Sequence, residues 1–437
     1  MTDKSSQGLL SVLGVGFGLA GAVGGTIGAG ILRTPGLVAE QLPAPELVLA
    51  IWVAGGLYAL LGAICVAELA SCLPRAGGWY VYAEAAFGRR TGFLVGWSDW
   101  IAHCIGLAWI VTTLGDYLRD LLPLSSSAIA LLILAVFTGI QWPGVRSGGA
   151  SQEVLSLIKA LAFLALVVAC FALPLPARIE APASFIPPGS PLLVPVVLAL
   201  QAVITTYDGW ACPIYFAEEF SEPAQVLPRS LIGGVLAVAV LYLLINAALL
   251  HVLPIPVLAE SNLPAAEAAR LLVGERGGQV ITAVALVALL GVTNTVVMAA
   301  PRILFGLGRD GFLPVGVAEV NSGGTPLTAL LITVGSTGLL VLSGSFERLL
   351  GMGAFLYVCL PLSGLIALLV LRRSQPDLER PFRCWGYPLT PVVVGGVSLM
   401  FLAAALWSDT VNSLLALALV LSGGLVAEAS NRLRPAA

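Results

Sequence analysis

The chain has 437 residues, of which 58% are hydrophobic and only 10% are charged, and its net charge is −3. Soluble proteins average about 25% charged residues, so this composition excludes an ordinary soluble protein and indicates a polytopic membrane protein. The sequence has no basic face for nucleic acid, and its seven cysteines form no CxxC pair. We therefore expect no zinc site, no disulfide framework and no cofactor.

Twelve apolar stretches follow one another along the chain, separated by polar residues, prolines and glycines. The polar residues 1–7 precede the first stretch without a cleavage pattern, so we expect no removable signal peptide. The sequence thus predicts twelve membrane-spanning helices. Their approximate limits are 9–33, 46–73, 91–118, 126–142, 152–173, 191–218, 229–252, 278–305, 325–343, 349–371, 388–406 and 410–427.

The basic residues are distributed unequally between the two sides of the membrane. With the N-terminus placed in the cytoplasm, fourteen of the 21 lysines and arginines face inward, six face outward and Lys159 lies within a span. Because cytoplasmic loops carry an excess of Lys and Arg, we expect both termini to lie in the cytoplasm, in a protein of the cytoplasmic (inner) membrane.

The first span contains Gly24-Gly25-Thr26-Ile27-Gly28-Ala29-Gly30, with four glycines in seven residues. Each glycine costs a helix about 1 kcal/mol relative to alanine. One interpretation is a helix broken at mid-membrane, whose second half presents free N–H groups to a carboxylate. The other is close packing of two helices through Gly24 and Gly28. The residues alone leave both interpretations open.

The sixth span contains a second weak point, Thr205-Thr206-Tyr207-Asp208-Gly209-Trp210-Ala211-Cys212-Pro213. Gly209 and Pro213 weaken the helix, and Asp208 places a carboxylate near mid-membrane. A central Asp costs about 2.5–3.5 kcal/mol on insertion scales, which indicates a paired or functional residue. Asp208 therefore contacts a substrate amine, carries a proton or accepts hydrogen bonds from unwound backbone.

The two broken spans each begin a block of five spans. This pattern predicts an inverted five-plus-five repeat with a binding site between the breaks. The repeats cover approximately residues 9–173 and 191–371, and two further spans lie at approximately 388–427. The whole chain then forms one transmembrane transporter domain.

Two further polar features lie inside spans. Asp99 and His103 are four residues apart and so share one helix face, as a proton path or as a local hydrogen-bonded pair. Lys159 lies about two turns into the fifth span. Its ammonium either faces unwound carbonyls at the first break or snorkels to the cytoplasmic face.

Several motifs, taken together and in this order, resemble those of the amino acid–polyamine–organocation superfamily, and in particular bacterial relatives of the L-type and cationic amino acid transporters. The resemblance covers nearly the whole chain. The motifs are Ala67-Glu68-Leu69-Ala70, Pro74, Ala76-Gly77-Gly78, Tyr80, Tyr82, Ala86-Phe87-Gly88, Glu218-Glu219, Gly308-Arg309-Asp310-Gly311-Phe312-Leu313-Pro314, Arg380-Pro381-Phe382-Arg383 and Tyr387-Pro388.

The resemblance implies an all-α fold of the LeuT type, with helices 1 and 6 broken, that carries amino acids by alternating access. It implies that backbone N–H groups of residues 27–31 hold the substrate carboxylate, and that carbonyls at both breaks hold its amine. Thr205 occupies a position where close relatives often have an aromatic gate, which Tyr207 or Trp210 could replace. The candidate substrate-binding residues are Thr26, Ile27, Gly28, Ala29, Gly30, Ile31, Thr205, Thr206, Tyr207, Asp208, Gly209 and Trp210.

By the same resemblance to sodium-independent members, the Lys159 ammonium takes the place of a sodium ion. It would join the fifth span to the first break and to the eighth span near Thr293 and Asn294. Animal relatives pair with a heavy subunit through a cysteine in an outer loop. The loop between the third and fourth spans has no cysteine here, so we expect no disulfide-linked partner.

The sequence and the resemblance together predict a sodium-independent carrier of L-amino acids, with neutral amino acids as the favoured substrates. A carrier of cationic amino acids or polyamines is the alternative, with Asp208 as the counter-charge. The sequence contains no GxxxxGK[ST] motif, which would indicate an ATP-driven pump. It also contains no compelling nucleophile–base pair, which would indicate an enzyme. Between the seventh and eighth spans, we expect a short helix over Ala265–Val273, capped by Asn262. The resemblance implies that it is an outer lid, and a plain amphipathic surface loop is the alternative.

Overall fold

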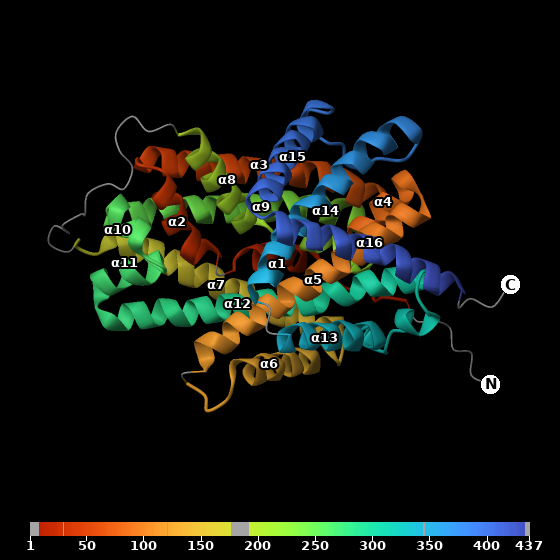
Figure 1. Ribbon diagram of the computed structural model, residues 1–437, viewed down its shortest axis with the longest axis horizontal. Helices are drawn as coiled ribbons and strands as arrows, with labels where there is room; N and C mark the ends of the chain where they lie inside the picture. The colour runs from red at the N-terminus through yellow and green to blue at the C-terminus, as the bar shows by residue number, and fades with distance from the viewer. Residues whose placement is uncertain (1–7, 29, 120, 176–191, 344–345, 433–437) are drawn as a thin grey trace.

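The computed structural model describes residues 8–28, 30–119, 121–175, 192–343 and 346–432, which are helical apart from loops and one β-bridge between Leu13 and Phe220 (Figure 1). The helices are α1 (Val15–Thr26), α2 (Gly30–Gln41), α3 (Pro45–Cys72), α4 (Trp79–Phe87), α5 (Arg89–Leu118), α6 (Ser126–Gln141), α7 (Val145–Ala172), α8 (Leu193–Tyr207), η1 (Cys212–Glu219), α9 (Pro223–Val252), α10 (Ile255–Glu260), α11 (Pro264–Val273), α12 (Glu275–Arg309), η2 (Val315–Ala318), α13 (Leu327–Leu342), α14 (Phe346–Ser374), α15 (Leu389–Ser408) and α16 (Thr410–Arg432).

Within these described residues, eight segments are long and apolar enough to cross a membrane, and the bent pair α1–α2 forms a ninth when it is counted as one span. The eight comprise α3, α5, α7, α8 with η1, α9, α12, the part of α14 from Gly351 and α15. Three shorter apolar helices lie at Ser126–Gln141, Leu327–Leu342 and Thr410–Gly424. The chain is therefore a multi-pass, all-helical membrane protein.

The first predicted span is interrupted at its glycine-rich stretch. Helix α1 ends at Thr26 and α2 begins at Gly30. The chain bends by 45° between the two helices. Helix α2 then continues to Gln41, well beyond the predicted limit of 33, with Pro35 and Gly36 inside it. Its contacts with α8, α10 and α11 stabilise the helix past these weak formers.

The sixth span also loses its α-helical geometry midway. Helix α8 ends at Tyr207, Asp208 has extended backbone, and Gly209 adopts φ +101°. The chain then tightens into the 3-10 helix η1, whose second residue is Pro213. A φ of this sign strongly favours glycine, so Gly209 permits the change of direction that Asp208 begins.

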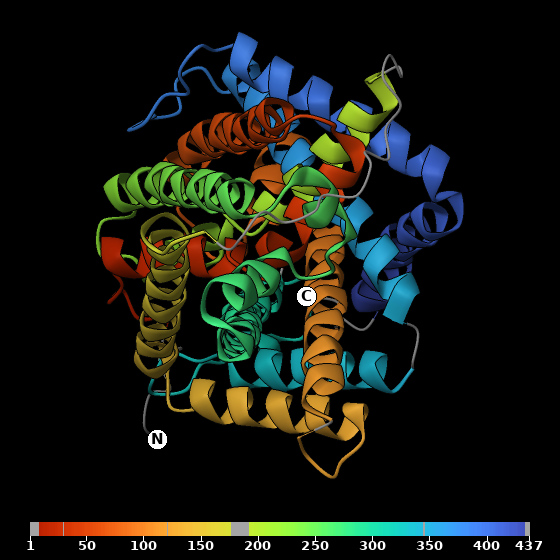
Figure 2. The ribbon, with the colours of Figure 1, turned by 90° about the vertical axis from the view of Figure 1, so that its left-hand side faces the viewer.

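The long helices run mostly along the longest axis of the molecule in Figure 1, with α10 and α11 at one end and α4 at the other. Helices α1, α3 and α7 all pack on α9, and α5 packs on α12. In Figure 2, seen from the end that carries α10 and α11, α6 and α13 lie together along one edge. The two breaks thus lie inside a layer of surrounding helices.

The short helix expected between the seventh and eighth spans is present as α11, at Pro264–Val273. Its N-cap, however, is Leu263, without a side-chain cap, so the expected capping by Asn262 is wrong. Proline at the first helical position needs no N–H partner, and the Ser261 hydroxyl accepts from the Leu263 N–H instead.

Candidate functional site

The two helix breaks lie against each other. A Cβ added at Gly209 would lie 2.4 Å from the carbonyl oxygen of Gly25, and one added at Gly25 would lie 2.9 Å from the Gly209 oxygen. Real Cβ atoms essentially never approach other atoms this closely. The backbones of residues 25 and 209 therefore meet only because neither residue has a side chain.

Hydroxyl groups connect the segments around this contact. The Thr34 and Thr206 hydroxyl oxygens are 2.6 Å apart, which joins α2 to α8. The Tyr242 hydroxyl of α9 lies 2.9 Å from the carbonyl oxygen of Thr26 and 3.3 Å from that of Thr206. Tyr242 is fully buried, so this single hydroxyl reaches the carbonyl groups of both broken spans.

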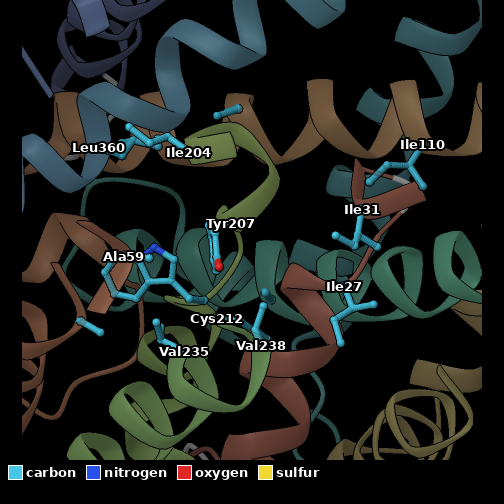
Figure 3. Close-up of a cluster of buried hydrophobic side chains, with 14 of the residues drawn as sticks. Ile27, Ile31, Ala59, Ile110, Ile204, Tyr207, Cys212, Val235, Val238 and Leu360 are labelled. Atoms are coloured by element: carbon cyan, nitrogen blue, oxygen red, sulfur yellow. The ribbon is translucent and has the colours of Figure 1, made fainter. Parts of the chain in front are cut away.

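Apolar side chains surround the breaks on the α9 side. Figure 3 shows Ile27 and Ile31 from the first break and Tyr207 from the second in one buried cluster, with Val235 and Val238 of α9. This packing shields the backbone groups of the breaks from lipid. In hydrocarbon, such groups are tolerated only inside protein or along a cavity.

The predicted residues of the first break divide into backbone and packing roles. Thr26 closes α1 with its hydroxyl donating to the Ala22 carbonyl, and the Gly28 N–H bonds the Thr26 carbonyl. Gly30 and Ile31 form the first turn of α2, where N–H groups have no intrahelical acceptor. Ala29 lies outside the described residues.

The predicted residues of the second break face different surroundings. Thr205 is exposed, Thr206 is turned toward Thr34, and Tyr207 lies 3.3 Å from the Trp52 carbonyl oxygen. Trp210 is buried and makes an edge-on contact with Trp79.

A pocket opens beside this second break. Asp208 lines it together with Thr205, Tyr207 and Trp210 of the same segment. Ile204 of α8 also lines it, and the rest of the lining comes from α3, α14 and α15, including Tyr58, Gly62, Tyr357, Pro361 and Val394. The described residues of the first break, 24–28, 30 and 31, do not line this pocket. Asp208 therefore faces α3, α14 and α15 on the far side of its segment.

Lys159 extends from α7 to the first break. Its ammonium nitrogen lies 2.7 Å from the Gly24 carbonyl oxygen and 2.9 Å from the Ile27 carbonyl oxygen. The side chain is fully buried, so it does not snorkel to the membrane surface. A cation thus faces carbonyl groups that the end of α1 leaves without helical partners.

Lys159 meets α12 at Gly291, where an added Cβ would lie 2.7 Å from the ammonium nitrogen. Within the described chain no hydrogen bond joins Lys159 to Thr293 or Asn294, the two residues expected beside it. The Thr293 hydroxyl donates to the Leu289 carbonyl of its own helix. The Asn294 amide is held by Gln141 and Gln152, with contacts of 2.8 and 2.9 Å.

The Asp99–His103 pair lies in α5 next to η1. Nδ1 of His103 is 2.8 Å from the Asp99 carbonyl oxygen and 3.1 Å from Oδ1 of Asp99. The Tyr215 hydroxyl of η1 donates to the same Oδ1 at 3.0 Å. The Trp79 backbone N–H also points to this carboxylate, which is fully buried.

An ionic network connects η1, α12 and the segment before α4. Arg302 donates to both carboxylate oxygens of Glu219, at 2.6 and 3.0 Å, and both residues are buried. Arg309 pairs with Glu218 and with Asp310, while Asp310 also accepts from Arg75 and from the Tyr80 hydroxyl, both at 2.6 Å.

The N-terminal segment joins the same region. The N–H groups of Val12 and Leu13 both bond the Glu219 carbonyl, and the Ser221 N–H bonds the Leu13 carbonyl. These contacts, with the ionic network, fasten the chain before α1 to the chain after η1.

Sequence reasoning overlooked Tyr242 and Gln152. Gln152 and Ser156 both donate to the Ala20 carbonyl of α1, so α7 holds α1 at two levels, here and at Lys159. The available signal was a tyrosine and a glutamine inside apolar spans, where a polar group needs a partner. Which carbonyl each would reach depends on helix packing.

Comparison with known proteins adds an independent finding. The amino acid permease family model matches residues 8–422. The chain is 28% identical over 438 residues to the serine/threonine exchanger SteT of Bacillus subtilis, covering 95% of this chain and 96% of that protein. It is 29% identical over 374 residues to the Asc-type amino acid transporter 1 of Mus musculus, covering 83% of this chain and 70% of that protein. It is 28% identical over 435 residues to the large neutral amino acids transporter small subunit 2 of Homo sapiens, covering 96% of this chain and 79% of that protein.

Proposed function

The chain belongs to the amino acid permease family, and from this premise we propose that it carries neutral L-amino acids across the cytoplasmic membrane by alternating access. Relatives named as a serine/threonine exchanger and as a transporter of large neutral amino acids support a neutral substrate. Transport of this kind needs no covalent chemistry and no cofactor.

The observation that carries this proposal is the meeting of the two breaks at Gly25 and Gly209. The first turn of α2 offers N–H groups and the positive end of its helix dipole to a carboxylate. The carbonyl groups at the end of α8 offer acceptors to an ammonium. An α-amino acid carries both charges on one carbon, so adjacent breaks of this type match its common backbone.

We propose that transport is independent of sodium because Lys159 supplies the cation. The ammonium contacts the carbonyl groups of Gly24 and Ile27, and in a LeuT-type carrier a metal ion would need such oxygen ligands. A second positive charge at the same carbonyl groups would be repelled.

For the topology, we propose twelve spans, from the eight long segments, the bent pair α1–α2 and the three shorter apolar helices. The inverted repeats would cover approximately residues 9–173 and 191–371, with both termini in the cytoplasm. The ionic network then lies on the cytoplasmic side, where it would keep the cytoplasmic entrance to the substrate site closed. Its members are Glu218, Glu219, Arg302 and Arg309. The lid helix α11 lies at the opposite, outer end.

The relative from Homo sapiens is named a small subunit. We propose that the present chain acts without a disulfide-linked partner, because its loop between the third and fourth spans has no cysteine. A disulfide-linked chain that purifies with the protein would refute this part of the proposal.

A second candidate substrate class is favoured by the placement of Asp208. Its carboxylate lines an otherwise largely apolar pocket, where it would suit the distal amine of a cationic amino acid or polyamine. Competition distinguishes the two classes, since arginine or putrescine would then inhibit uptake more strongly than neutral amino acids. The Asp208→Asn variant would lose that preference.

The test is counterflow of radiolabelled amino acids into sodium-free proteoliposomes preloaded with an amino acid mixture. We expect saturable accumulation of neutral amino acids, and equal uptake when sodium replaces potassium. Accumulation of only cationic substrates would favour the second candidate. No accumulation of any amino acid by folded protein would refute amino acid transport.

A further inference from the structure

One buried carboxylate remains unexplained by the binding of an amino acid backbone. Asp99 is fully buried in α5, and among the described residues its carboxylate contacts only neutral donors and the His103 ring: the Tyr215 hydroxyl, the Trp79 backbone N–H and Nδ1 of His103. A fully buried carboxylate without a Lys or Arg partner is costly to keep ionised, so binding a proton lowers that cost. The structure therefore places a candidate proton acceptor inside the membrane domain.

His103 is the less deeply buried member of the pair. Its side chain is 12% exposed, whereas that of Asp99 is 0% exposed. The Nδ1 atom contacts Oδ1 of Asp99 at 3.1 Å, so the other ring nitrogen, Nε2, is left to receive a proton from water. The partly exposed His103 side chain is thus in direct contact with the fully buried Asp99 carboxylate.

Tyr215 connects the carboxylate to the segment that follows the second break. Its hydroxyl donates to Oδ1 of Asp99, and its ring packs on the His103 ring at a centroid distance of 4.9 Å. Gly78 makes room for this arrangement, since a Cβ there would lie 2.2 Å from the Tyr215 ring and 3.1 Å from Oδ2 of Asp99. Each of these three side chains, Asp99, His103 and Tyr215, therefore contacts the other two, and together they join α5 to η1.

The other titratable groups around this unit carry no positive charge. They are Cys104 of α5, Cys212 of η1, Tyr357 of α14 and Asp208 at the second break, and Asp208 is within electrostatic range of both Asp99 and His103. Over the described ranges of the chain, no lysine or arginine forms an ion pair with Asp99 or Asp208. A proton is the charge that the structure leaves available to balance two carboxylates here.

We propose that Asp99 and His103 form the proton-binding site of this carrier, and that Tyr215 couples its occupancy to movement of η1. The inference rests on the proposed amino acid transport and adds its driving ion. A proton from water binds Nε2 of His103, and the Nδ1 proton passes to Oδ1 of Asp99. The imidazole is then neutral with its proton on Nε2, the carboxylic acid is neutral, and one proton has been taken up.

The coupling follows from the strength of one hydrogen bond. While Asp99 is ionised, the Tyr215 hydroxyl donates to a charged acceptor, and such bonds are roughly twice as strong as bonds between neutral groups. Protonation of Asp99 weakens this bond and releases η1 from α5. Because η1 continues directly from the second break, its release is the movement that alternating access requires.

The test uses purified full-length protein in proteoliposomes and two assays. Counterflow at equal pH reports binding and translocation without net proton movement. Uptake driven by acid outside, followed with a pH-sensitive dye in the lumen, reports proton coupling. With one proton per amino acid, a gradient of one pH unit supports up to about tenfold accumulation in the parent protein.

In Asp99→Asn, we expect a pH gradient to give no more uptake, relative to counterflow, than is seen without a gradient. Adding substrate should not acidify the lumen of these vesicles. His103→Gln keeps the carboxylate and should shift the pH profile of uptake, which a purely structural role would not do. Tyr215→Phe should retain proton binding but weaken the coupling. Asp116→Asn, an exposed site on the same helix, is the matched control and should behave like the parent.

Each outcome decides the proposal. Undiminished gradient-driven uptake and an unchanged pH profile in Asp99→Asn and His103→Gln would overturn it. Counterflow without any proton response in the parent would overturn it as well, while leaving amino acid transport intact. Absence of counterflow in the parent would refute the proposed transport and the proton coupling together. If Asp99→Asn does not fold, the pH profile of His103→Gln decides the matter.

Discussion

The ammonium nitrogen of Lys159 lies 2.7 Å from the carbonyl oxygen of Gly24, and both residues are buried. Gly24 lies in the last turn of α1, so its carbonyl is one of those that a helix end leaves unsatisfied. The same ammonium reaches the Ile27 carbonyl beyond the end of α1. Lys159 thus contacts both the end of the helix and the unwound residues that follow it.

Replacing Lys159 by Ala should reduce sodium-free counterflow more than about tenfold, a loss that corresponds to about 1.4 kcal/mol. The change removes a charged donor from two buried carbonyls, and hydrogen bonds to charged groups contribute about 1.5–3 kcal/mol each. Size-exclusion chromatography establishes that the variant is folded. Unchanged uptake with an unchanged pH dependence would contradict the proposal that Lys159 supplies the cation at the first break.

Replacing Gly209 by Ala should abolish transport and lower thermal stability. The new Cβ would lie 2.4 Å from the Gly25 carbonyl oxygen, and the backbone at φ +101° is strained for any residue with a side chain. Gly335→Ala is the matched control, because Gly335 lies in α13 with no atom within 4 Å of an added Cβ. Equal activity of both variants would show that the two breaks need not touch.

Replacing Arg302 by Met should destabilise the protein by about 3–5 kcal/mol, because Glu219 then keeps an uncompensated charge in a fully buried position. Thermal unfolding in detergent measures the change. The double variant with Glu219→Gln should recover part of the loss. Arg270→Met removes the partner of Glu267 at an exposed site and should change stability little. A similar loss in both arginine variants would contradict a special role for burial.

Asp310 should make stability depend on pH in the acid range. Burial raises the pKa of its carboxyl, but hydrogen bonds from Arg309 and Tyr80 and the charges of Arg309 and Arg75 lower it more, so the pKa lies below its ordinary value. A lowered pKa stabilises the folded state above the unfolded pKa of about 3.9, and this contribution is lost as pH falls through the folded pKa. The melting temperatures of the parent and of Asp310→Asn should therefore differ most near neutral pH and converge below about pH 4. A difference that grows on acidification would contradict this sign.

The sequence alone established the class of protein and located its weak points. Composition required a membrane protein, because so few charged residues cannot cover a soluble surface. The glycines of residues 24–30 and the Asp208-Gly209 pair marked where helices α1 and α8 end, since local backbone preferences determine where a helix breaks. The motifs from Glu68 to Pro388 indicated the family that the comparison then confirmed.

The tertiary structure decided which groups meet. Sequence spacing placed Asp99 and His103 on one face, but only packing brings Tyr215 to the same carboxylate and leaves that carboxylate without a Lys or Arg partner in the described chain. Lys159 was expected to reach the eighth span near Thr293 and Asn294, and it meets α12 at Gly291. The two polar side chains themselves bond within their own helix and to Gln141 and Gln152. Such contacts join residues more than a hundred positions apart. They depend on the rotation and depth of each helix in the bundle, which local preferences and hydrophobic pattern do not specify.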